Sequence, residues 1–144
     1  MTQAEQALKE KIRSGNLEVV EIYRNQTGPT IEQAWMKMAN IDVEPVDTVP
    51  LSSSDLAQIT QLWLNRAQAG GIIEDDGTFL LTAVTTGSSG VGWVRVRLTP
   101  DTDMSRLTDD RGNIEFIARS SDGKSICGVT SEEYDYWVVL ISNP

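Results

Sequence analysis

Closely spaced glycine turns after position 70 constrain the fold more than any other feature of this sequence. Four turn signals, each with glycine after acidic, basic or serine residues, lie at 75–77, 87–90, 109–112 and 121–123. Such segments accept the positive backbone angles of tight turns. The intervening runs are rich in β-branched and aromatic residues. We therefore expect an antiparallel β-meander of about five strands, at 78–85, 91–98, 114–119, 124–129 and 134–141.

Helical spacing is typical of the sequence before Gly70. Residues 3–13 predict a short polar helix with a narrow apolar stripe, formed by two residues four positions apart. Residues 55–69 repeat apolar side chains at helical spacing, with Ser54 as the expected N-cap and Gly70 as the stop. This longer helix is expected to cover one face of the sheet.

A strand and a third helix are predicted between those two helices. Residues 17–23 alternate loosely and indicate a strand. Thr30 and Gln33 form a capping-box pattern, so a helix is expected to begin there and to lie beside helix 55–69 on the same face of the sheet. Its apolar face would consist of Ile31, Ala34, Trp35 and Met38.

Residues 40–53 contain Pro45 and Pro50 and cannot form a helix interior, so they predict an extended arm or an edge strand. The segment either lies on its own domain or reaches another subunit. The run 134–141 is apolar on both faces, which indicates a central strand or an oligomer contact. The candidate interface residues are Ile41, Val43, Val46, Tyr136 and Trp137.

The patterns together predict an α+β protein in which N-terminal helices and an extended arm pack on a C-terminal antiparallel β-meander. Residues 1–70 would form a mainly helical part with the extended segment 40–53, and residues 71–144 the β part. A chain of 144 residues has the usual size of one domain. We therefore expect the two parts to form one compact unit.

The sequence contains no histidine and one cysteine, Cys127, which excludes Ser-His-Asp catalysis, histidine metal sites, four-thiolate zinc and internal disulfides. Carboxylate pairs remain, but each lies in a predicted turn, where aspartates usually bond their own backbone. The segment from Asp101 to Asp103 departs from the EF-hand pattern and leaves a calcium loop of another kind open. The prediction is a protein without catalytic residues, metal or cofactor.

Charge and hydropathy bear on partners and location. Twelve basic against 21 acidic residues give a net charge of −9, so no nucleic-acid partner is expected, although a DNA mimic stays open. Residues 1–14 lack the apolar region of a signal peptide, and the longest apolar run, 137–141, is far shorter than the ~20 residues of a membrane helix. We expect no membrane insertion, and a cytoplasmic protein or part of an assembled particle.

Trp93, Arg95 and Arg97 alternate along one predicted strand and share one of its faces. With Arg119 nearby, they could form a stacking platform for a glycan or another ligand. The alternative is a solvated face on which the arginines pair with Glu115 or with turn aspartates of other strands.

The chain has a short helical front part, a proline-bearing extended segment and a β-rich back half with turns at Gly77, 87–90, Gly112 and Gly123. In this architecture it resembles small structural proteins of tailed bacteriophage particles, including tail and head-decoration proteins. The resemblance implies assembly of a symmetric particle through protein contacts. The sequence therefore predicts a non-catalytic assembly protein that forms a homo-oligomer or is one component of a particle. The alternatives are a glycan- or protein-binding module and an acidic inhibitor.

Overall fold

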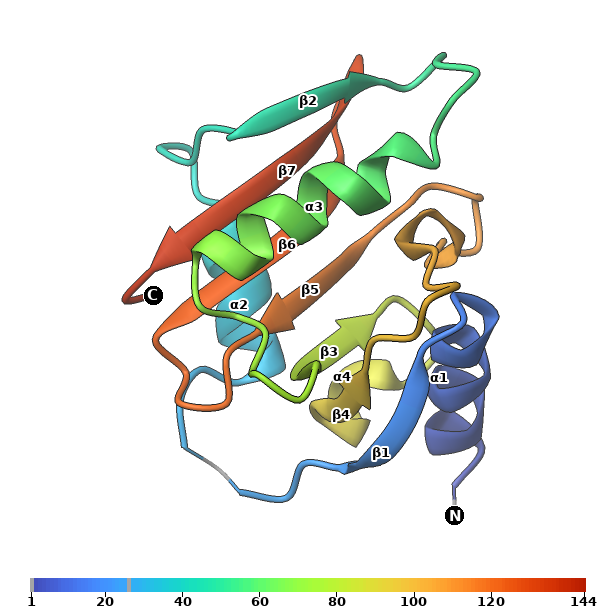
Figure 1. The fold of residues 1–144 in the computed structure, drawn as a ribbon, viewed down its shortest axis with the longest axis vertical. Helices are drawn as coiled ribbons and strands as arrows, with labels where there is room; N and C mark the ends of the chain where they lie inside the picture. The colour runs from blue at the N-terminus through green and yellow to red at the C-terminus, as the bar shows by residue number, and fades with distance from the viewer. Residues whose placement is uncertain (1, 26) are drawn as a thin grey trace.

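The computed structural model describes residues 2–25 and 27–144. Within them, one antiparallel sheet has seven strands in the order β1-β4-β3-β5-β6-β7-β2 (Figure 1). The strands are β1 (Glu18–Ile22), β2 (Asp47–Pro50), β3 (Thr78–Ala83), β4 (Val94–Arg97), β5 (Phe116–Arg119), β6 (Ser125–Ser131) and β7 (Asp135–Ser142). The helices are α1 (Gln3–Ser14), α2 (Ile31–Met38), α3 (Gln58–Ala69), α4 (Ser88–Val91) and the 3-10 helix η1 (Met104–Arg106). The α+β class is confirmed, with seven strands in place of five.

The two additional strands come from the front half of the chain and form the two edges of the sheet. β1 pairs with β4, and β2 pairs with β7 at the opposite edge (Figure 1). Val49 of β2 is buried, and Asp47 forms a 2.9 Å ion pair with Arg66 of α3. The predicted extended arm is therefore an edge strand of its own sheet, and β7 is an interior strand.

The expected pairing of consecutive strands is confirmed for β3 with β4, β5 with β6 and β6 with β7, but it is wrong for β4 with β5. β3 lies between β4 and β5 and pairs with both, so the chain passes β3 on its way from β4 to β5. This connection contains η1, whose Met104 is fully buried. The predicted strand 91–98 is shorter because Val91 belongs to α4 and Gly92 has a positive φ of 87°.

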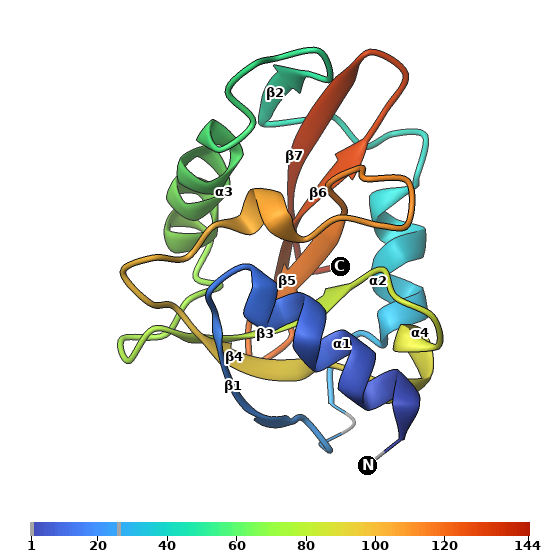
Figure 2. The same cartoon turned by 90° about the vertical axis from the view of Figure 1, so that its right-hand side faces the viewer.

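The helices α2 and α3 cover opposite faces of the sheet, which corrects the expectation that they lie side by side (Figure 2). α3 packs on β6 and β7 from one side. α2 covers the other side, where Ile31 and Ala34 join a cluster with Leu80 and Ile117. The physical reason is visible in β3, where all six residues are buried and both faces therefore need cover.

The larger core cluster lies between α3 and the sheet. Trp63 of α3 is fully buried, with its ring centroid 5.4 Å from that of Phe79 and 5.6 Å from that of Phe116. Its Nε1 donates a 3.1 Å hydrogen bond to the carbonyl oxygen of Cys127. Leu8 and Ile12 of α1 belong to the same cluster, so the narrow apolar stripe of that helix is a core face.

Two helix starts were predicted from capping patterns, with different outcomes. At α2 the capping box is confirmed, because Thr30 Oγ1 accepts from Gln33 N at 3.1 Å and Gln33 Oε1 accepts from Thr30 N at 3.0 Å. α3 begins at Gln58 instead of Asp55, and no side chain caps it. Across the described residues, no helix is long and apolar enough to cross a membrane.

Candidate functional site

Several of the turn carboxylates accept local hydrogen bonds, as predicted from the sequence. Asp76 accepts hydrogen bonds from the hydroxyl and the amide of Thr78, and the hydroxyl bond in particular lowers the pKa of Asp76 below its usual value. Asp122 accepts from the amide of Lys124 at 2.9 Å, which lowers its pKa in the same way. In the described part of the chain, no group of three or more His, Cys, Asp or Glu side chains could hold a metal ion.

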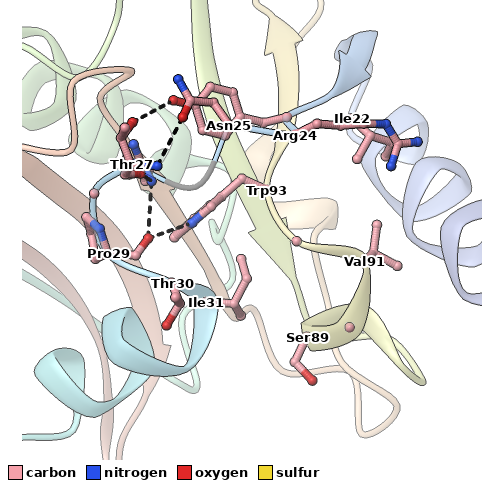
Figure 3. Close-up of a pocket in the computed structure, with 15 residues that line it drawn as sticks. Ile22, Arg24, Asn25, Thr27, Pro29, Thr30, Ile31, Ser89, Val91 and Trp93 are labelled. Carbon is pink, nitrogen blue, oxygen red and sulfur yellow. Dashed lines mark hydrogen bonds between the residues drawn. The ribbon is translucent and has the colours of Figure 1, made fainter.

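A pocket of about 440 Å³ lies between the connection from β1 to α2 and the segment 89–93 (Figure 3). We call it the Trp93 pocket. Trp93, the residue before β4, points toward Pro29, and its Nε1 donates a 2.9 Å hydrogen bond to the Pro29 carbonyl oxygen. Trp93 is 5% exposed, so its side chain is almost entirely covered by the protein itself.

Arg119 forms the buried wall of the Trp93 pocket. Its guanidinium donates hydrogen bonds of 2.9 to 3.1 Å to the carbonyl oxygens of Thr27, Pro29, Ser120 and Ser121. Burial lowers the pKa of Arg119 from its usual value. These contacts hold the connection from β1 to α2 against the sheet.

Cation and aromatic side chains alternate in a column on this face of the sheet. The guanidinium carbon of Arg119 lies 5.7 Å from the ring centroid of Trp93 and 5.3 Å from that of Tyr23. The guanidinium carbon of Arg95 also lies near Tyr23, 5.6 Å from the centroid of its ring. All three distances are typical of cation–π contacts. The column fixes Tyr23, and with it the end of β1.

The predicted platform residues Arg95 and Arg97 are engaged in ion pairs with glutamates of β1 and of the connection between α3 and β3. Arg95 lies 3.4 Å from Glu21 and 3.6 Å from Glu74, and Arg97 lies 2.7 Å from Glu18. The structure thus brings Trp93 and Arg95 together through Tyr23 and Arg119, and places Arg97 apart from them on the β1–β4 pair. The arginines pair with glutamates as in the solvated-face alternative, although with other partners than Glu115.

Apolar side chains gather in a second site, a groove of about 390 Å³ where α2 ends and the chain turns toward β2. We call it the tryptophan groove. Trp35 of α2 and Trp137 of β7 line it and are half-buried, Val43 is half-buried, and Ile41 is 96% exposed. Three of the five predicted interface residues therefore lie at one surface.

The other two predicted interface residues belong to the opposite side of the sheet. Tyr136 is 3% exposed, and its hydroxyl accepts a 3.3 Å hydrogen bond from the amide of Ile114. Val46 packs against the same core cluster. The alternation of β7 separates Tyr136 from Trp137, because adjacent residues of a strand face opposite ways.

Two carboxylates complete the lining of the tryptophan groove, and sequence reasoning missed them. Glu115 is half-buried and accepts a 2.7 Å hydrogen bond from the hydroxyl of Ser131, whereas Glu132 is exposed. Trp35 was missed as well, because its helical spacing with Ile31 and Met38 is that of a core face.

No protein-family model, curated protein or solved structure matches this chain.

Proposed function

We propose that this protein is a non-catalytic assembly protein that contacts other protein subunits through the tryptophan groove. The observation that carries the proposal is the clustering of Trp35, Ile41, Val43 and Trp137 at one surface. Exposed apolar clusters commonly mark protein contacts, and tryptophan is enriched among the residues that dominate binding energy. An almost fully exposed isoleucine beside two tryptophans fits such a contact.

The Trp93 pocket supports the alternative of a small binding module less well. A ring that stacks on a sugar or a base needs a free face. Trp93 is 5% exposed, and Arg119 and Pro29 contact it from inside the protein. The pocket is therefore better explained as the place where the connection from β1 to α2 is anchored.

An acidic inhibitor that imitates DNA is the other alternative. A DNA mimic presents carboxylates to its target in place of phosphates. Asp76, Asp103 and Asp122 instead accept hydrogen bonds within their own turns or from a neighbouring helix, which favours a structural role for them. A role in a phage particle, as either a homo-oligomer or one component among several, remains a prediction from the sequence resemblance.

The test is a selection of peptides from a random displayed library on the immobilised full-length protein. Binders are then tested on Ile41→Asp, and on Val20→Asp as a matched control at the opposite edge of the sheet. Both residues are exposed, so both variants should fold. We expect a class of peptides that binds the wild type and Val20→Asp but does not bind Ile41→Asp. Binding that is equal on both variants would refute the groove as the contact surface.

A further inference from the structure

Resting on the proposed function, we infer that the partner at the tryptophan groove is a basic segment of a different protein: apolar side chains flanked by Lys or Arg. The shape of the groove gives the first part of the argument. At about 390 Å³ it has room for one or two large side chains, and the half-buried rings of Trp35 and Trp137 offer them apolar contact. The partner must therefore present large apolar residues.

The charges around the groove give the second part. Glu115 and Glu132 line it, and Asp42 and Glu44 are exposed on either side of Val43 in the sequence. Among the described residues, no Lys or Arg lies within ion-pair distance of any of these four carboxylates.

Lys and Arg side chains are also missing from the described lining of the groove. The basic residue of α2 that lies nearest in sequence to Trp35, Lys37, lines a different pocket together with Gln33 and Pro144. An apolar surface with unpaired acids at its rim is complementary to an apolar segment with basic flanks, and such complementarity speeds association and rejects acidic partners.

A second copy of this chain fits the same surface poorly. In a two-fold symmetric contact the same patch faces itself, so the carboxylates of Glu115 and Glu132 would approach their own copies. Each chain also carries a net charge of −9, which adds to the repulsion. A partner of opposite charge removes both costs.

The peptide selection also tests this inference, because the charges of the selected peptides, and their affinity for variants that lack the carboxylates, can be measured. The probes are the groove-dependent peptides, and the variants are Glu115→Gln with Glu132→Gln, and Glu5→Gln with Glu10→Gln on α1 as the matched control. We expect Lys and Arg to be enriched at the flanks of the peptides. Affinity should fall about two- to tenfold on the groove variant at low salt, and stay unchanged on the α1 variant.

Each other outcome has a definite meaning. Groove-dependent peptides that are neutral or acidic would overturn the basic partner and leave the proposed function standing. A selection without any groove-dependent peptide would overturn both. Light scattering of the protein alone supplies the last arm: a dimer that forms in the wild type and is lost in Ile41→Asp would show that the occupant is a second copy, against the inference.

Discussion

Nη1 of Arg119 lies 3.1 Å from the carbonyl oxygen of Pro29 and donates a hydrogen bond to it across 90 residues of sequence. The same nitrogen donates to the carbonyl oxygen of Thr27 at 2.9 Å. A single buried side chain of β5 thus fixes the segment that leads from β1 to α2. The energetic weight of this arrangement can be measured.

Replacing Arg119 by Met should lower the free energy of unfolding by about 3 kcal/mol, because carbonyl oxygens would lose a charged donor in a buried place. Urea unfolding followed by circular dichroism measures the change. The control is Arg111→Met, at an exposed position, for which we expect a change within about 0.5 kcal/mol. Equal effects of the two substitutions would mean that the guanidinium contacts do not stabilise the fold.

Gly28 approaches the same guanidinium. Its φ is +76°, and a Cβ there would lie 2.7 Å from Nη2 of Arg119. Gly112 has a similar φ of +81°, but a Cβ there would meet no heavy atom of the described residues within 4 Å. We expect Gly112→Ala to cost about 1 kcal/mol through its backbone angle, and Gly28→Ala about 1–3 kcal/mol more through crowding. Thermal unfolding of both variants tests the difference, which should vanish if the Arg119 side chain moves aside freely.

Local signals predicted local structure well. The capping box at Thr30 and Gln33 placed the start of α2, and the glycine turns separated most of the strands of the back half. These features depend on residues that are neighbours in sequence. The start of α3 was missed because Ser54 is of a residue type that often caps helices but does not cap this one.

The arrangement of the sheet could not be predicted in the same way, because strand order depends on pairings between distant segments. β3 pairs with β4, as the meander predicts, but it also pairs with β5, and no local pattern marks this second pairing. The run Phe79-Leu80-Leu81 did contain a usable signal: consecutive apolar residues indicate a strand covered on both faces, and hence helices on both sides.

The candidate site was predicted in part for a similar reason. Ile41, Val43 and Trp137 were chosen from their segments alone, and they meet at the tryptophan groove only because β7 and the end of α2 are brought together by the fold. Trp35 has the sequence spacing of a core residue and is half-buried at the surface.

Trp63 offers a test of the core between α3 and the sheet. Trp63→Phe keeps an aromatic ring but removes the hydrogen bond from Nε1 to the Cys127 carbonyl oxygen and leaves space in a fully buried site. We expect the free energy of unfolding to fall by about 1–3 kcal/mol. Trp35→Phe is the matched control at a half-buried surface position, with a smaller expected loss. Urea unfolding of the two variants shows whether Trp63 contributes more to stability than Trp35.

Cys127 is expected to make the protein less stable as the pH rises into the alkaline range. Burial raises the pKa of its thiol from 9.0 to about 12. In the unfolded chain the thiol ionises from about pH 9 upward, whereas in the folded protein it stays protonated, so the unfolded state binds fewer protons in this range. The contribution of the thiol is thus fully present below about pH 9 and is lost as the pH rises toward 12.

The expected slope is a loss of up to about 1.4 kcal/mol per pH unit above pH 9, relative to the variant Cys127→Ala, which lacks the thiol. All other ionisable groups are shared by both proteins, so their contributions cancel in the difference. Urea unfolding of the two proteins at several pH values between 8 and 11 measures it. A difference that stays constant with pH would show that the thiol ionises equally easily in both states, and hence that Cys127 is accessible to water in the folded protein.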